Sequence, residues 1–239
     1  MSPTVEDLTV RNGLITVVVA DFQPLSAQRS LAAGLAASGA RLAVRRIDAV
    51  RDLAGTYVYH DLSALADGYA ALLGDRPVDC VAGYCSAAGL AERIAVRLGE
   101  PPVVLVKPSR PTVRQAVDDF AAFLAKLRAT AATEPELPPC GPALHAAMNG
   151  RLSAALSAWA SADGMDADEV ELLEAELLAR FDGWLGFLLA TAARPDPVPL
   201  SRKAVVHGLE LDDPVVTATV AAITWIVADE RSADVPSAP

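Results

Sequence analysis

Basic residues are scarce in this chain of 239 residues, and they do not cluster. Lys and Arg number 20 against 30 Asp and Glu, so the formal net charge is −10 at pH 7. The densest basic spot is the pair Arg45–Arg46. Because nucleic-acid binding needs clustered Lys and Arg against the phosphates, we expect no nucleic-acid partner.

Cysteine is also rare, since the chain has only Cys80, Cys85 and Cys140. An odd and sparse set in a chain of this size does not indicate a disulfide framework. Cys80 and Cys85 lack a nearby second cysteine pair or a helical pair of histidines, so the spacing does not indicate a metal site. We expect neither a metal nor another cofactor.

Long apolar runs are absent as well. Charges or glycines interrupt every run well short of the roughly 20 residues that a membrane-spanning helix needs. The chain does not open with a basic segment followed by an apolar stretch, so the sequence predicts no signal peptide. We therefore expect a cytoplasmic protein with no membrane partner.

The residues that are present favour an α/β fold. Apolar residues make up 52% of the chain and aromatic residues only 5%, so Ala, Leu and Val supply the core. The length fits a single domain over residues 1–239. In the first half, strand patterns alternate with helix patterns, as in a mostly parallel sheet with helices on both faces. The expected strands are 14–20, 41–47, 78–82 and 103–106, and the expected helices are 28–37, 61–73 and 88–98.

From residue 112 onward, helices follow one another without a strand between them. A helical segment at this place in an α/β chain is the expected position of a lid, so we predict a lid insertion at 112–192. We expect residues 1–12 and the tail after Ala228 to lie outside the regular structure. The expected elements are helices at 112–130, 143–160 and 166–192, a strand at 203–207 and a helix at 213–229.

The sharpest motif surrounds Cys85. A strand, a turn of the form Gly-X-nucleophile-X-small and then a helix are the parts of a nucleophile elbow. Gly83 and Ala87, two positions either side of Cys85, are small, as such a strained turn requires. The dipole of the following helix would favour a Cys85 thiolate, and the N–H of Ser86 would be placed to bind an oxyanion.

A structural role is the alternative for this cysteine, because free Cys is among the most buried residue types. Cys85 would then be a buried residue in an ordinary strand-to-helix turn. Cys80, inside the expected strand, is interpreted as core. Cys140, in a Pro-rich loop, is given no functional role.

At these residues the chain resembles the thioesterases of polyketide and nonribosomal-peptide pathways, a branch of the α/β-hydrolase superfamily. The likeness is best over Tyr59–Leu98, where residues 83–91 (GYCSAAGLA) look like the family's elbow with Cys in place of Ser. Residues 103–111 resemble the strand and loop that follow, and residues 180–200 resemble the last lid helix and its exit. The resemblance implies an α/β-hydrolase fold and a hydrolase or transferase acting in the biosynthesis of antibiotics and similar natural products.

Three departures from the family pattern bear on activity. The loop at residues 20–24 (ADFQP) lacks the glycine that helps to form the family's oxyanion hole. Lys107 stands where many members carry the acid of the catalytic triad. The loop at 208–213 (GLELDD) lacks the family's catalytic histidine.

His207, just upstream of that loop, is the best substitute base, because Cys needs less activation than Ser. The alternative is a partly buried His207 that makes a backbone contact. Asp212 and Asp213 could orient an imidazole, but acids also favour the start of a helix. Two further histidines are expected to be structural or peripheral, namely His60 as a solvent-facing neighbour of a helix start and His145 as a structural or pocket-lining residue.

Acyl chemistry is the first functional hypothesis. A thioester on Cys85 would carry an acyl or aminoacyl group, and transfer between carriers is favoured over hydrolysis because no well-placed His and acid activate water. The donor would be the thioester of an acyl or peptidyl carrier protein. Carrier proteins are acidic, so docking would use a basic patch, for which the candidates are Lys107, Arg110 and Arg114. The candidates for the substrate pocket are Phe22, Tyr84, Lys107 and Trp184; Trp184, with Phe187 and Leu188, could equally be ordinary core.

Two other functions stay open. The chain could be a thioesterase-like binding protein that has lost its triad, as the three departures suggest. It could also catalyse another α/β-hydrolase reaction, such as ester or lactone hydrolysis or the cyclisation of an intermediate.

Overall fold

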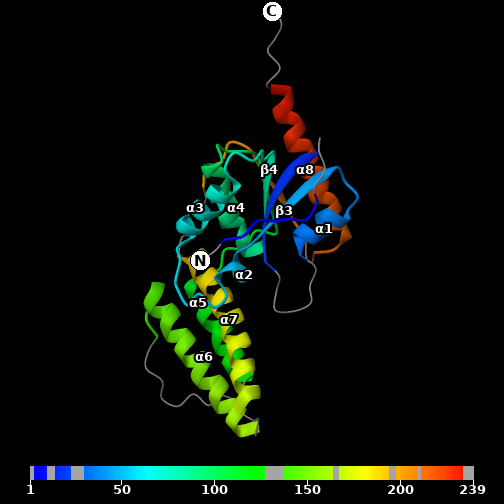
Figure 1. Cartoon of the computed structure of the whole chain (residues 1–239). Coiled ribbons are helices and arrows are strands. Elements are labelled where there is room, and N and C mark those ends of the chain that lie inside the picture. The colour runs from blue at the N-terminus through cyan, green and yellow to red at the C-terminus, as the bar shows by residue number, and fades with distance from the viewer. Residues whose placement is uncertain are drawn as a thin grey trace, which may run out of the picture. The chain divides into compact units, whose positions relative to one another are not determined.

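The computed structural model describes residues 3–9, 14–22, 30–126, 137–163, 167–193, 198–208 and 211–233. The chain divides into two compact units, which are described separately (Figure 1). The sheet unit comprises Ser2–Ala49, Leu62–Arg110 and Asp196–Pro239. The helical unit comprises Val50–Asp61 and Pro111–Pro195.

The sheet unit is built on a sheet of six strands within the described residues, in the order β1-β3-β2-β4-β5-β6. β1 runs antiparallel to β3, and all other neighbouring pairs are parallel. The sheet is therefore mostly parallel, as the sequence predicts. The strands are β1 (Glu6–Asp7), β2 (Ile15–Asp21), β3 (Leu42–Asp48), β4 (Cys80–Tyr84), β5 (Val103–Val106) and β6 (Lys203–Val206).

The central strands form because their sequences are continuous apolar runs. Val17, Val18 and Val19 of β2 are fully buried, although successive side chains of a strand point to opposite faces. Both faces of the sheet must therefore be covered, which is typical of parallel sheets.

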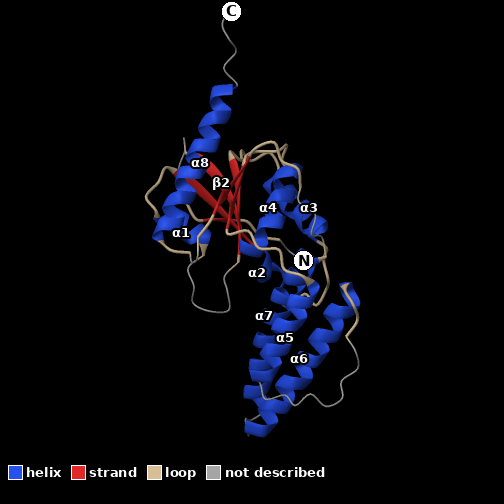
Figure 2. Cartoon of the chain, turned by 180° about the vertical axis from the view of Figure 1, so that it is seen from behind, coloured by secondary structure: helices blue, strands red, loops and turns tan. Residues whose placement is uncertain are grey.

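Helices cover the two faces of this sheet, with α1 and α8 on one side and α3 and α4 on the other (Figure 2). Ser30 caps α1, because its hydroxyl accepts a hydrogen bond of 3.1 Å from the N–H of Ala33. Gly34 of α1 lets this helix approach α8 closely, since an added Cβ would lie 2.9 Å from Val216. The helices are α1 (Leu31–Ala37), α3 (Leu62–Leu73), α4 (Ala88–Arg97) and α8 (Asp213–Ala233).

Two expectations about the chain ends are wrong. Residues 1–12 contain β1, which pairs with β3 and is held by an ion pair of 3.1 Å between Arg45 Nε and Asp7 Oδ1. A two-residue acidic strand has no apolar alternation by which a sequence pattern could reveal it. The tail beyond Ala228 also begins later than expected, because α8 continues to Ala233.

The helical unit has its own apolar core. Its helices are α2 (Ala49–Leu53, all but its first residue), α5 (Val113–Lys126), α6 (Gly141–Asp163) and α7 (Ala167–Ala192). The fully or almost fully buried residues of this core include Phe120, Leu144, Met148, Leu152 and Leu185. Within the described residues, no helix combines the length and the apolar character needed to cross a membrane.

The helical segment predicted at 112–192 corresponds to Pro111–Pro195, but the unit also takes in Val50–Asp61. The sequence patterns did not predict α2. The use of the helical unit as a lid stays a prediction, as does the expected single domain.

Candidate active site

The candidate residues Cys85, Lys107 and His207 follow three strands that are aligned with one another. Tyr84 at the end of β4 pairs with Val106 of β5, and Val106 pairs with Val206 of β6. Each candidate residue is the next one after these partners. Neighbouring strands lie about 4.8 Å apart, so the backbones of Cys85 and His207 are separated by two strand spacings, about 10 Å, with Lys107 between them.

Cys85 has the backbone of a nucleophile elbow. Its φ is +52°, a left-handed conformation that is uncommon for a residue other than glycine. The Cys85–Ala87 segment forms one 3₁₀ turn between β4 and α4, and the carbonyl oxygen of Cys85 accepts a hydrogen bond of 3.1 Å from the N–H of Ser109. Cys85 is partly exposed, whereas Cys80 is fully buried. The buried structural reading therefore fits Cys80 and does not fit Cys85.

Gly83 makes this turn possible. A Cβ added there would lie 2.6 Å from the Cβ of Ala91 and 2.9 Å from the Cα of Ala88. These contacts are shorter than atoms tolerate, so only glycine lets α4 pack this closely on the end of β4. The small residue that the elbow pattern requires is thus explained by helix–strand packing.

The two aromatic pocket candidates, Phe22 and Tyr84, lie together. Their ring centroids are 6.3 Å apart at an angle of 41°. Burial raises the pKa of the Tyr84 phenol, and electrostatic interactions with Cys85 and Asp21 raise it further. Tyr84 therefore stays protonated at neutral pH, with Cys85 and Asp21 in its surroundings.

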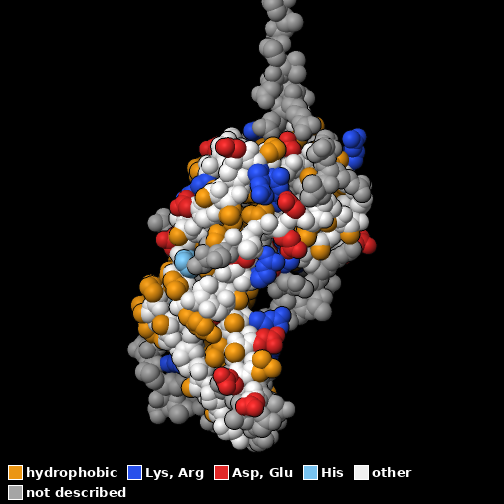
Figure 3. Space-filling model, viewed as in Figure 1, with side chains coloured by type: hydrophobic (Ala, Val, Ile, Leu, Met, Phe, Trp, Pro, Cys, Tyr) orange, Lys and Arg blue, Asp and Glu red, His pale blue; other side chains and the backbone are white. Residues whose placement is uncertain are grey.

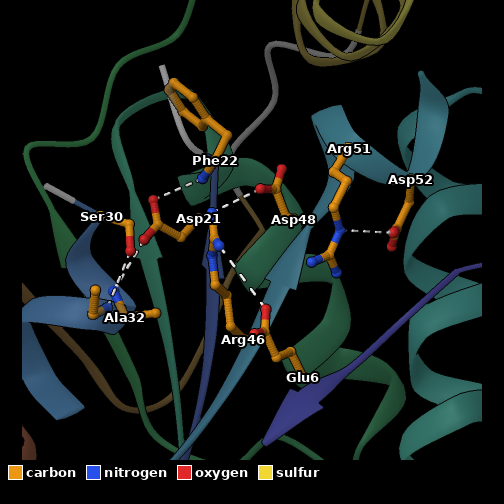
Figure 4. A network of polar contacts seen from close by, with 10 residues as sticks. Glu6, Asp21, Phe22, Ser30, Ala32, Arg46, Asp48, Arg51 and Asp52 are labelled. Atoms are coloured by element: carbon orange, nitrogen blue, oxygen red, sulfur yellow. Dashed lines mark hydrogen bonds and ion pairs between the residues drawn. The ribbon is translucent and has the colours of Figure 1, made fainter. Parts of the chain in front are cut away.

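Asp21, which the sequence did not single out, ends β2 as a buried carboxylate with only 1% of its surface exposed (Figure 4). Its two oxygens accept hydrogen bonds from the N–H of Phe22 at 2.7 Å and from the N–H of Ala32 at 3.0 Å. Burial raises the pKa of Asp21, although these hydrogen bonds and the charge of Arg46 act in the opposite direction.

A second buried acid, Asp48, ends β3 and pairs with Asp21 in the strand register. Arg46 contacts it, with 2.7 Å between Arg46 Nη2 and Asp48 Oδ2 (Figure 4). The carboxyl edge of the sheet therefore carries acids on β2 and β3, and Lys107 and His207 follow β5 and β6. Cys85 lies between these two groups.

His207 is exposed, and it follows β6 instead of ending it as predicted. Asp212, the candidate orienting acid, caps α8, because its Oδ1 accepts a hydrogen bond of 3.0 Å from the N–H of Val215. The helix-start interpretation of Asp212 is thus confirmed. Lys107 is a partly exposed residue with φ +47°, and its N–H donates to the carbonyl of Val206 at 2.9 Å. Ser86, the oxyanion candidate, is a partly exposed residue of the 3₁₀ turn.

Two of the three basic residues proposed to dock a carrier, Arg110 and Arg114, have acidic partners. Arg110 lies 3.9 Å from the buried carboxylate of Glu92, which also contacts Lys203 at 3.4 Å. Arg114 lies 3.8 Å from Asp118 on α5. On the face seen in Figure 3, several of the described basic side chains lie beside acidic ones.

Trp184 belongs to the helical unit. It is partly buried, and its ring meets that of Phe181 edge-on at 6.0 Å. Phe187 and Leu188 are buried, as expected of ordinary packing. A role for Trp184 in a substrate pocket stays a prediction.

The helical unit holds a buried polar cluster that the sequence did not reveal. Asp182 is 1% exposed and accepts from the N–H of Tyr57 and from Asn149 Nδ2, both at 2.8 Å. His145 Nε2 lies 3.1 Å from Asp182 Oδ1. Burial alone would raise the pKa of Asp182, but hydrogen bonds from His145, Tyr57 and Asn149 outweigh it and lower that pKa. His145 is thus a structural residue, one of the two roles expected for it.

His60 is partly exposed. Its Nε2 atom is buried and has no hydrogen-bond partner among the described residues. Burial lowers the pKa of this imidazole, so His60 is neutral at pH 7.

No protein-family model and no curated protein sequence matches the chain. Among solved structures, a loop variant of the haloalkane dehalogenase DbeA from Bradyrhizobium elkanii matches 96% of this chain and 99% of its own, with a TM-score of 0.50 and 11% identity. This chain has the α/β-hydrolase fold. The prediction of fold class is therefore confirmed, and at this identity the likeness concerns the fold alone.

Two other solved structures are similar to a lesser degree. The NocB thioesterase domain, in covalent complex with a fluorophosphonate nocardicin G analogue, matches 94% of this chain and 99% of its own, with a TM-score of 0.45 and 14% identity. The acetyl esterase MekB matches 96% of this chain and 69% of its own, with a TM-score of 0.39 and 10% identity.

Proposed function

We propose that this protein carries an acyl or aminoacyl group as a thioester on Cys85 and transfers it to a second thiol. The observation that supports this most directly is the partly exposed Cys85 at φ +52° on the turn between β4 and α4. Left-handed backbone at a residue other than glycine stores strain and occurs often at functional sites. A cysteine that only packs in a core would not need this conformation.

The proposed step is a thioester exchange. The Cys85 thiol loses its proton to His207, and the thiolate attacks the carbonyl carbon of the donor thioester. The new C–S bond to Cys85 forms, and the C–S bond to the donor sulfur breaks. The donor sulfur leaves with the electron pair and takes the proton back from His207. The N–H of Ser86 would bind the oxyanion of the intermediate.

Transfer is favoured over hydrolysis because the chain offers little to activate water. Lys107 stands where an orienting acid would serve His207. Asp212 is engaged at the start of α8 through the N–H of Val215. A thiolate acceptor needs less help than water, so an incoming thiol should resolve the Cys85 thioester faster than hydrolysis does.

The proposed donor is the thioester of an acyl or peptidyl carrier protein in natural-product biosynthesis. Phe22, Tyr84 and Lys107 are candidates to line the entrance at the sheet edge. A carrier that docked on Arg110 or Arg114 would compete with Glu92 and Asp118 for these cations.

Intact-protein mass spectrometry tests the proposal. The full chain is incubated with an acyl-N-acetylcysteamine thioester, and we expect one acyl adduct that peptide mapping assigns to Cys85. Cys80→Ala and Cys140→Ala should keep the adduct, and Cys85→Ala should lose it. Turnover of the donor by the wild type without an adduct would indicate a hydrolase, and neither adduct nor turnover would indicate a binding protein. Both results would contradict the proposed transfer.

The role of His207 gives a separate prediction. His207→Gln should slow the acylation of Cys85 about tenfold at pH 7, because a positioned base contributes at least this much to proton removal. His60→Gln is the matched control, because His60 has no part in the proposed step, and its rate should equal that of the wild type. The rate of adduct formation is measured in samples quenched at successive times. Equal rates for all three proteins would show that His207 does not act as the base.

A further inference from the structure

One buried group beside the elbow has no part in the exchange described above, and this inference rests on the proposed function. We propose that the Asp21 carboxylate occupies the second oxyanion donor of the site, the N–H of Phe22, and thereby protects the Cys85 thioester against hydrolysis.

The position of the Phe22 N–H follows from the sheet register. In an elbow, one oxyanion donor is the N–H after the nucleophile, and the other comes from the loop after the neighbouring strand. β2 is the strand beside β4, and Ala20 pairs with Gly83. Counting on from that pair places Asp21 level with Tyr84 and Phe22 level with Cys85. The ring contact between Phe22 and Tyr84 agrees with this placement.

The same N–H already has a partner. Asp21 Oδ1 accepts it at 2.7 Å, a short distance for a hydrogen bond from a backbone N–H. Asp21 Oδ2 accepts from Ala32 at 3.0 Å, so the carboxylate is fixed at both oxygens (Figure 4). With 1% of Asp21 exposed, water cannot readily replace either bond.

The negative charge of Asp21 disfavours the oxyanion, as does its hydrogen bond to the N–H of Phe22. A carbonyl oxygen that becomes negative would meet a carboxylate where a free donor is needed, which disfavours the tetrahedral intermediate. The influence of Asp21 on the pKa of Tyr84 agrees with a position near the elbow. Attack by water, which starts from a weak nucleophile, should suffer most from the missing donor.

The consequence is a long-lived acyl-enzyme. Of the two donors named here, only the N–H of Ser86 would remain, so the hydrolytic step, in which water adds to the carbonyl carbon and the C–S bond to Cys85 breaks, becomes slow. An acceptor thiolate, the better nucleophile, could still resolve the thioester. Asp21 is in this sense a positioning residue that selects transfer over hydrolysis.

The test measures the lifetime of acyl-Cys85 after the donor has been removed. Asp21→Ala removes the acceptor that occupies the Phe22 N–H and should shorten the half-life about a hundredfold, the lower end of the range for one oxyanion donor. Ser30→Ala is the matched control, because it removes a different hydrogen bond at the start of α1, the one to Ala33, and leaves Phe22 bound. Its half-life should equal that of the wild type.

Asp21→Asn serves if Asp21→Ala does not fold, as judged by circular dichroism. The amide keeps an oxygen that can accept the N–H of Phe22 but removes the charge, so we expect a smaller loss of lifetime, about threefold, well below what a whole donor contributes. Adducts of equal lifetime in the wild type and in the folded Asp21 variants would overturn this inference and leave the proposed function standing. The absence of an adduct in every protein would overturn both.

Discussion

Replacing Gly83 by alanine should destabilise the protein by about 3 kcal/mol, as overpacking of a tight contact does. The new Cβ would lie 2.6 Å from the Cβ of Ala91 and 2.9 Å from the Cα of Ala88. Neither atom belongs to a flexible side chain, so the strand end and α4 would have to separate. The same movement would displace the turn at Cys85, and acylation there should fall with the stability.

Gly89→Ala is the matched control for this prediction. Gly89 lies in α4, the helix that a Cβ at Gly83 would meet. A Cβ added at Gly89 would approach no atom closer than 3.4 Å, at Leu62 Cδ2. Alanine is the better helix former by up to about 1 kcal/mol, so this variant should be as stable as the wild type or more stable. Urea unfolding measures both variants, and a Gly83→Ala protein that matches Gly89→Ala would show that the close packing is not required.

Replacing Asp182 by alanine should lower the free energy of unfolding by about 3 kcal/mol or more, because each buried donor that loses its acceptor costs about 1 to 3 kcal/mol. Three donors lose their acceptor at once, namely the N–H of Tyr57, Asn149 Nδ2 and His145 Nε2. Asp119→Asn, an exposed change on α5, should alter the free energy of unfolding by no more than about 0.5 kcal/mol. Urea unfolding at pH 7 compares the two.

The pH dependence of Asp182 follows from its lowered pKa. In the unfolded chain the group titrates near its ordinary value of 3.8, and in the folded protein it titrates at lower pH. The folded state is therefore stabilised above about pH 4, and this contribution is lost as the pH falls through the folded pKa. Between pH 5 and pH 2.5 the wild type should lose more stability than Asp182→Asn. Parallel losses in the two proteins would contradict the assignment.

Those parts of the fold that depend on local pattern could be predicted from the sequence. The valine run of β2 predicts a strand buried on both faces, and β5 begins and ends at the predicted residues. The elbow was visible because close helix–strand packing requires a small residue at position 83. In each case the physical cause lies within a few residues of the pattern that reveals it.

The missed features depend on contacts between distant residues or on one side-chain conformation. Asp182 binds the N–H of Tyr57, which is 125 residues away in the chain. β1 is held to β3 by antiparallel backbone pairing and by ion pairs from Arg45 and Arg46, and it has no apolar pattern. The sequence shows that the loop after β2 lacks a glycine, but it does not show that the Asp21 carboxylate turns back to the N–H of the next residue.

The helical unit is discontinuous in the chain, and this limits how it can be transferred to another protein. Segment 50–61 contributes the N–H of Gly55, which donates to Ala179 at 3.2 Å, and the Val50 carbonyl, which leaves no room for a side chain at Gly183. A chimera that received residues 111–195 alone would lack the N–H that Ala179 accepts and the backbone that packs against Gly183. The transplantable module is therefore the two segments together, and recombination breakpoints that separate them should yield insoluble hybrids.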